Sequence, residues 1–123
     1  MNVDLRPAAA VGHVFLSASD VPAASARLEA IGLRPIVVRE QLAVIEMRGG
    51  THIVLRRHDQ PGSFSASFDL MYDDLELART KLEAAGFVIS PVQHGGIHSQ
   101  FRATAPELFE IKVVSSHAGQ RPV

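Results

Sequence analysis

One stretch of this chain occurs twice, 54 positions apart, and it limits the possible folds more than any other feature. Residues 20–33 read DVPAASARLEAIGL, and residues 74–87 read DLELARTKLEAAGF. Both copies begin with Asp, contain Leu-Glu-Ala and reach a Gly 12 positions after the Asp. Asp is a favourable helix N-cap and Gly a favourable helix terminator. The repeat therefore predicts two copies of one helical unit, neither of which buries its apolar face alone.

The composition restricts the class of protein. The 123 residues are enough for one domain, residues 1–123, with a real core. Net charge is −1 and no basic block is present, which argues against nucleic acid as a partner. The absence of cysteine excludes disulfides, thiolate metal sites and a cysteine nucleophile. No membrane-length apolar run and no signal peptide are found, so we expect a cytoplasmic protein without a membrane partner.

Strand-like runs surround each predicted helix in the same order. We expect a first module at about 11–57, a linker at 58–63 and a second module at about 64–115, each with the order βαβββ. The predicted strands are 11–18, 35–39, 42–47, 51–57, 64–72, 87–92, 97–103 and 108–115. The predicted fold is α+β, with the two modules forming a curved eight-stranded mixed sheet around a cavity.

Alternation along the strands assigns their side chains to faces. Apolar residues such as Val14 and Leu16 are predicted to face the helix, which turns His13 and Phe15 to the other face. In the fourth strand, Ile53 and Leu55 match Ile111 and Val113 of the last strand after a slip of four residues in the loops. The same slip matches His52 to Glu110. We expect His13, His52 and Glu110 on the face away from the helices, where they can converge.

These features together resemble the vicinal oxygen chelate superfamily, which includes glyoxalase I, extradiol dioxygenases, fosfomycin-resistance enzymes and bleomycin-resistance proteins. The resemblance covers residues 11–114. It rests on the paired βαβββ order, on Gly12-His13-Val14 with Asp20 seven residues after the His, and on Phe109-Glu110-Ile111 in the last strand. It implies a small-molecule substrate and, by analogy, a homodimer.

The resemblance also implies a set of metal ligands. The inward positions of the first and last strand of each module are His13, His52, Ser67 and Glu110. Ser67 departs from the usual His, which favours a site of two His and one carboxylate: His13, His52 and Glu110. Such a set suits Fe, Mn, Ni or Zn. Asp69, on the same face as Ser67, is the candidate fourth ligand or catalytic base.

Other residues are candidates for contact with the substrate. Phe15 could stack on an aromatic ligand, and Ser67 faces the expected cavity. His98, Gln100 and Arg102 share one face of a strand, where they either line the pocket or form the rim of a solvated sheet. The simpler alternatives are histidines satisfied by water or backbone, and a Glu110 that pairs with Lys112 or Arg102.

The leading functional hypothesis is a metal-dependent enzyme of glyoxalase or dioxygenase type that acts on a small oxygen-rich substrate. The alternative is a metal-free protein that binds and sequesters a small molecule, as bleomycin-resistance proteins do. The sequence does not identify the substrate, the reaction or the metal. It also leaves open whether the two modules pair within one chain or are swapped between two chains.

Overall fold

The structure is a computed structural model that describes residues 3–60, 65–116 and 119–123. The elements of the first module are β1 (His13–Ala18), α1 (Val21–Ala30), β2 (Arg34–Val38), β3 (Leu42–Glu46), the short 3-10 helix η1 (Arg48–Gly50) and β4 (His52–Arg57). Those of the second are β5 (Ser65–Tyr72), α2 (Leu75–Ala84), β6 (Val88–Ile89), β7 (Gln93–His94), β8 (Ser99–Ala105) and β9 (Leu108–Ser115). Residues 61–63 of the predicted linker and Phe64 of the predicted strand lie outside the described residues.

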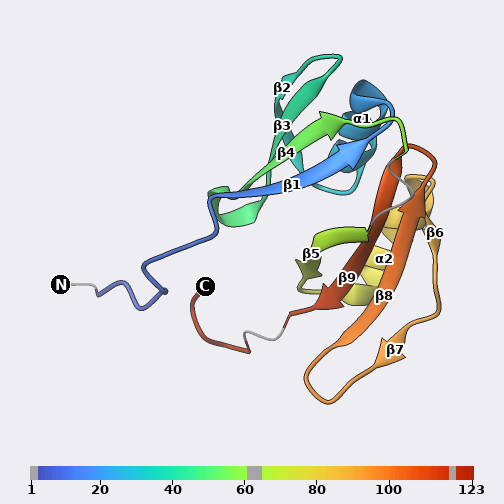
Figure 1. The fold of residues 1–123 in the computed structure, drawn as a ribbon. Coiled ribbons are helices and arrows are strands. Elements are labelled where there is room, and N and C mark those ends of the chain that lie inside the picture. The colour runs from blue at the N-terminus through green and yellow to red at the C-terminus, as the bar shows by residue number, and fades with distance from the viewer. Residues whose placement is uncertain (1–2, 61–64, 117–118) are drawn as a thin grey trace.

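The α+β fold of two βαβββ-like modules is confirmed, and the sheet differs in detail from the expected one. The strands form two sheets, one with the order β2-β3-β4-β1 and one in which β9 pairs with both β5 and β8. A single antiparallel pair, Ala18 opposite Leu108, joins them into a nine-stranded ladder. The additional strand is β7, whose two residues pair with β8 and are too few for a periodic sequence signal. Figure 1 shows the first sheet, in blue and green, above the second, in yellow to red.

The two helices begin and end as the repeat predicts. The Asp20 and Asp74 carboxylates each accept a hydrogen bond of 3.0 Å from the backbone N–H three residues further on. Gly32 and Gly86 follow the helices with φ of 107° and 89°, a conformation that favours glycine. Both ends of both helices are therefore fixed by local sequence.

The core lies between the helices and one face of each sheet. In β1, Leu16 and Ala18 are buried, whereas His13 and Phe15 are exposed on the opposite face, as predicted. Both modules contribute to one hydrophobic cluster. Its largest fully buried members are Phe101, Leu28, Ile31, Ile45, Ile53, Leu55, Leu82, Ile111, Val21 and Val113. In the described part of the chain, no helix combines the length and apolarity needed to span a membrane.

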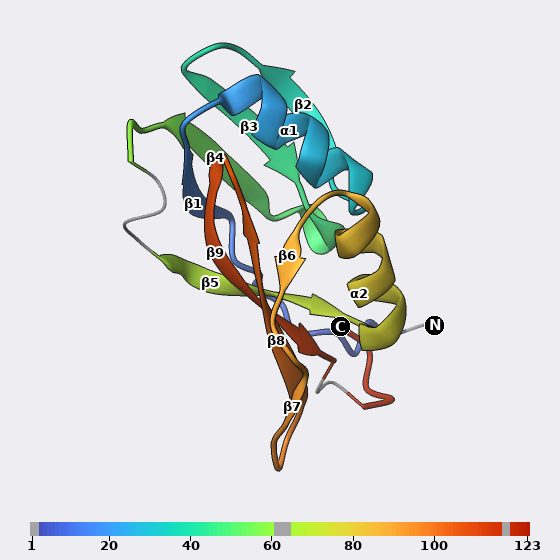
Figure 2. The ribbon, with the colours of Figure 1, turned by 90° about the vertical axis from the view of Figure 1, so that its right-hand side faces the viewer.

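The modules are connected by hydrogen bonds that cross between them at the helix ends. The Tyr72 hydroxyl donates to the Ile31 carbonyl at 2.9 Å, and Arg27 Nη1 donates to the Ala85 carbonyl at 2.5 Å. Ile31 and Ala85 are equivalent positions of the repeat, so each helix C-terminus is capped by the other module. Arg27 also forms a 2.5 Å ion pair with Glu107, which is only 6% exposed. Figure 2 shows α1 and α2 on the same side of the molecule.

Candidate functional site

His13 and His52 lie side by side on the open face of the first sheet. They are opposite each other in the parallel pairing of β1 with β4, and their ring centroids are 5.8 Å apart at an interplanar angle of 74°. Two further bonds align the starts of these strands: His52 N–H donates to the Gly12 carbonyl at 2.9 Å, and Thr51 Oγ1 donates to the Val11 carbonyl at 2.6 Å. The structure thus brings two of the three predicted metal ligands together.

Glu46 extends this group, and sequence reasoning missed it. Glu46 is opposite His52 in the antiparallel pairing of β3 with β4, and its Oε2 lies 3.3 Å from His52 Nε2. Arg34, on β2, forms an ion pair with the same carboxylate. Hydrogen bonds from Arg34 and then from His52 lower the pKa of Glu46. The signal that could have found Glu46 is the hairpin register set by the turn at Arg48–Gly50.

Glu110, the third predicted ligand, has a different neighbour. Its carboxylate lies 3.6 Å from Arg102 Nη1, the ion pair that was the simpler alternative for this residue. In the parallel pairing of β5 with β9, the register shifts so that Ser65 is opposite Glu110 and Asp69 is opposite Lys112. Ser67 is therefore not paired with Glu110 as His13 is with His52.

The donor set fits a divalent ion in part. Two adjacent imidazoles are suitable ligands for a first-row metal. Among the described residues, however, no group of three or more His, Cys, Asp or Glu side chains is arranged to hold an ion. Within one chain the structure supplies the histidine pair, and the participation of Glu110 stays a prediction.

A cavity of about 630 Å³ lies between the two modules. The residues that line it are Val11, Val14, Met47 and Thr51 of the first module, and Ala66, Ser67, Phe68, Asp69, Met71 and Lys112 of the second. Ser67 and Asp69 were predicted to face a cavity, and Lys112 was not among the predicted site residues. Lys112 lies in the lining because it is opposite Asp69 in the pairing of β5 with β9, which places both side chains on the same face of the sheet.

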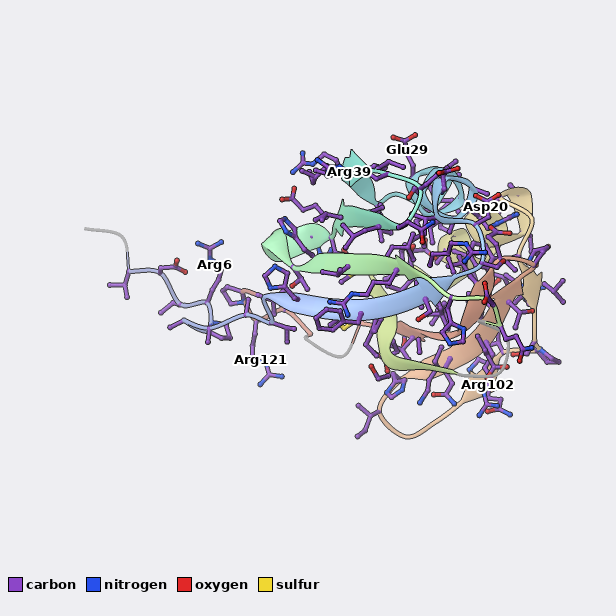
Figure 3. The ribbon with its side chains drawn as sticks, turned by 45° about the horizontal axis from the view of Figure 1, so that its top comes forward. Arg6, Asp20, Glu29, Arg39, Arg102 and Arg121 are labelled. Atoms are coloured by element: carbon purple, nitrogen blue, oxygen red, sulfur yellow. The ribbon has the colours of Figure 1, made fainter. Side chains whose placement is uncertain are left out.

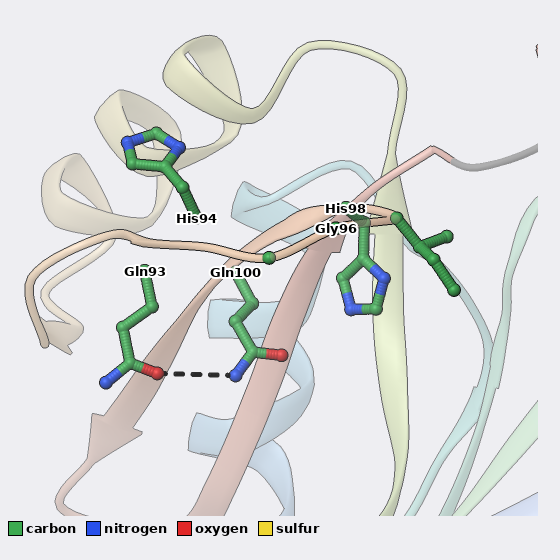
Figure 4. Close-up of a pocket in the computed structure, with 7 residues that line it drawn as sticks. Gln93, His94, Gly96, His98 and Gln100 are labelled. Atoms are coloured by element: carbon green, nitrogen blue, oxygen red, sulfur yellow. Dashed lines mark hydrogen bonds between the residues drawn. The ribbon is translucent and has the colours of Figure 1, made fainter.

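His98 and Gln100 belong to a separate and smaller hollow at the tip of the β7–β8 hairpin (Figure 4). Its volume is about 290 Å³, and Gln100 Nε2 lies 3.5 Å from Gln93 Oε1 across it. His94 points away from His98 and lies 2.8 Å from the Ser99 hydroxyl. Arg102 does not line this hollow.

Phe15 and Arg102 occupy the open faces of different sheets. Phe15 is 53% exposed, and Arg56 Cζ lies 5.0 Å from the centroid of its ring, a cation–π arrangement. Figure 3 shows Arg102 on the opposite side of the molecule from Glu29 and Arg39. The predicted substrate-binding residues therefore fall into several groups rather than one.

Comparison with known proteins places this geometry in a fold family. No family model matches the sequence, and no curated protein matches it. Lactoylglutathione lyase from Agrobacterium tumefaciens has a TM-score of 0.70 at 17% identity, over 94% of this chain and 99% of that one. The bleomycin-binding protein of Streptomyces verticillus, solved with copper(II)-bleomycin, has a TM-score of 0.69 at 17% identity, over 90% and 99%.

A third structure, described as a possible glyoxalase from Bacillus cereus, has a TM-score of 0.66 at 25% identity, over 86% of this chain and 98% of that one. The resemblance seen in the sequence is confirmed at the level of the fold. The chain has the fold of the glyoxalase, bleomycin-resistance and dioxygenase superfamily, the vicinal oxygen chelate proteins. This fold occurs in both a lyase and a binding protein, so the function of this chain has to be inferred from its site.

Proposed function

We propose that this protein binds a small amphipathic molecule in the cavity between its two modules. The observation that supports this function is the cavity itself, because about 630 Å³ falls within the roughly 300–1,000 Å³ typical of ligand pockets. Its lining comes from both modules and includes apolar side chains with a few polar groups, as such pockets usually do.

The lining also indicates the chemistry of the ligand. Val11, Val14 and Met47 form an apolar wall on the side of the first module. On the other side, Asp69 and Lys112 are neighbours in the strand pairing, yet within the described residues neither has an ion-pair partner. The Lys112 ammonium suits a ligand with an apolar body and a carboxylate or other oxygen-rich group.

Binding of matched probes tests this proposal. We expect 3-phenylpropionate to raise the Tm of the wild type more than 3-phenylpropionamide does, because only the carboxylate carries a charge. In Lys112→Met, binding of the carboxylate should weaken about 10-fold or more, the effect of one charge-assisted hydrogen bond. Lys81→Met, which removes an exposed lysine outside the cavity, is the control. Equal binding of both probes to wild type and Lys112→Met would contradict the proposal.

A metal-dependent enzyme is the second candidate, favoured by the adjacent imidazoles of His13 and His52. In this proposal Fe, Mn, Ni or Zn is held by His13 and His52 of one chain and by Glu110 of the second chain of a homodimer. A divalent ion bound there supplies Lewis-acid chemistry to a substrate oxygen. Asp69 is the proposed base for such a reaction.

Metal content of the purified protein tests this candidate. We expect His13→Ala, His52→Ala and Glu110→Ala each to lose most of the metal, whereas His94→Ala keeps it. If the ligands come from two chains, hybrids of His13→Ala and Glu110→Ala subunits should regain one intact site per dimer. A monomer in light scattering, or full metal in all three variants, would overturn this candidate and leave the cavity proposal in place.

A further inference from the structure

Two opposite charges line the cavity between the modules without neutralising each other. Asp69 of β5 is opposite Lys112 of β9 in the parallel strand pairing, and both side chains belong to the cavity lining. Within the described residues, neither forms an ion pair with the other or with a third residue, and both are exposed. The cavity therefore offers one anionic and one cationic group to a ligand.

The strand pairing also sets the separation of these two groups. Neighbouring strands of a sheet lie about 4.8 Å apart, so two residues opposite each other start from adjacent positions on the same face. The carboxylate and the ammonium therefore do not lie at opposite ends of the cavity. Such a pair fits a ligand whose own opposite charges are a few atoms apart, and not a long molecule that is charged at its two ends.

The neighbouring hydroxyl groups differ in their availability. Ser67 precedes Asp69 by two residues in β5, so its hydroxyl is on the same face as the carboxylate. A ligand ammonium has three donors, which a carboxylate and a hydroxyl can accept together. Thr51, by contrast, already donates its hydroxyl hydrogen to the Val11 carbonyl at 2.6 Å. β5 thus provides acceptors for an ammonium, and β9 provides the donor for a carboxylate.

We propose that the ligand of this cavity is a zwitterion, an α-amino acid with an apolar side chain. Its ammonium binds to Asp69 and Ser67, its carboxylate binds to Lys112, and its side chain packs against the apolar wall of the first module. This inference rests on the proposed binding function of the cavity and adds the second charge of the ligand. A ligand with a carboxylate alone meets the like charge of Asp69, and an amine alone meets that of Lys112.

Three probes with the same phenyl ring test the proposal: L-phenylalanine, 3-phenylpropionate, which lacks the ammonium, and 2-phenylethylamine, which lacks the carboxylate. We expect the wild type to bind L-phenylalanine most tightly in isothermal titration calorimetry at neutral pH. Asp69→Asn should weaken binding of L-phenylalanine about 5-fold or more, because one charge-assisted hydrogen bond at an exposed position is lost. The same variant should strengthen binding of 3-phenylpropionate about 2-fold, because a like charge is removed. Glu29→Gln, which removes an exposed carboxylate outside the cavity, should change neither.

Lys112→Met gives the converse measurement. It should weaken binding of L-phenylalanine and strengthen binding of 2-phenylethylamine, because it removes the partner of the carboxylate and the like charge that opposes the amine. Lys81→Met, which removes an exposed lysine outside the cavity, should leave both affinities unchanged. Effects of opposite sign identify a contact with the ligand, since a distorted cavity would weaken all three probes.

Two results would overturn the zwitterion and leave the binding function of the cavity in place: a wild type that binds 3-phenylpropionate as tightly as L-phenylalanine, or an Asp69→Asn variant that loses both probes alike. If the wild type binds none of the three probes, the binding function of the cavity fails, and this inference fails with it. Circular dichroism shows whether each variant is folded. Where a variant is not, the order of the three affinities in the wild type still decides.

Discussion

The two modules have the same arrangement of helix and strands, but they differ in the residues on the open face of the sheet, where a site would form. Both have an Asp cap, a helix of 10 residues and a Gly with positive φ. At the equivalent inward positions, however, the first module places His13 opposite His52, whereas the register shift in the second places Ser65 opposite Glu110. The two copies of the repeat therefore share the residues that form the fold and differ in the residues on the open face.

At the junction between the modules, equivalent residues of the repeat also differ in their contacts. Arg27 reaches across to the Ala85 carbonyl, to Glu107 and to the face of Phe87, whose ring centroid is 5.8 Å away. Lys81, the equivalent residue of the second module, is exposed on α2. The repeat is therefore symmetric in its backbone and asymmetric in its polar contacts: Arg27 bonds across the junction, whereas Arg48 of the first module forms a separate ion pair with Asp73 of the second.

Removal of the Arg27 guanidinium should have the largest effect. We expect Arg27→Met to lower the free energy of unfolding by about 3 kcal/mol, because it leaves the buried Glu107 carboxylate without its partner. The equivalent change Lys81→Met should cost less than about 0.5 kcal/mol, as exposed substitutions usually do. Urea denaturation of both variants measures the difference. Similar losses of stability in the two variants would contradict a larger role for Arg27 than for Lys81.

The helix caps should behave alike in the two modules. Asp20→Ala and Asp74→Ala should each lower stability by about 1 kcal/mol, because each removes one carboxylate-to-backbone bond of 3.0 Å. The double variant should lose the sum of the two, since the caps share no contact. Thermal and urea unfolding check this. A loss of stability in only one of the two single variants would contradict the equivalence of the two helix caps.

Tyr72 should have the smallest effect at neutral pH and a distinct pH dependence. Ala18 occupies the equivalent position in the first module, so only the second module has this hydroxyl. Burial raises the pKa of Tyr72 from 10.0 to about 12, which means that the folded state favours the neutral phenol. Its contribution to stability is complete below pH 10 and is lost as pH rises from about 10 to about 12.

Tyr72 is the single tyrosine of the chain, so ultraviolet titration reports it directly. Tyr72→Phe should cost roughly 0.5–1 kcal/mol at neutral pH through loss of the bond to Ile31, and should remove this component of alkaline destabilisation. Ionisation of the folded protein at the ordinary pH of a free tyrosine would contradict the buried position.

Much of the fold could be predicted from the sequence because its signals are local. The spacing from Asp20 to Gly32, repeated from Asp74 to Gly86, determines two helices with their ends. Alternation of apolar residues determines which face each strand buries, as Leu16 shows. These features depend on contacts within a few residues, which a sequence states directly.

The site was less predictable because its members meet through strand pairing. The His13–His52 contact was expected, whereas Glu46 joins it through a hairpin register that composition does not reveal. Lys112 likewise reaches the cavity because the β5–β9 register places it beside Asp69. A shift of one residue in either register would turn these side chains to the other face.

The sequence by itself determined the two modules, their helix caps, the buried faces of the strands and the pair of histidines on the open face. Only the tertiary structure decided that the sheets join through Ala18 and Leu108, that Arg27 and Tyr72 cross between the modules, and which side chains line the cavity. The physical reason is range: caps and alternation act between near neighbours, whereas register and module docking depend on residues that are far apart in the chain.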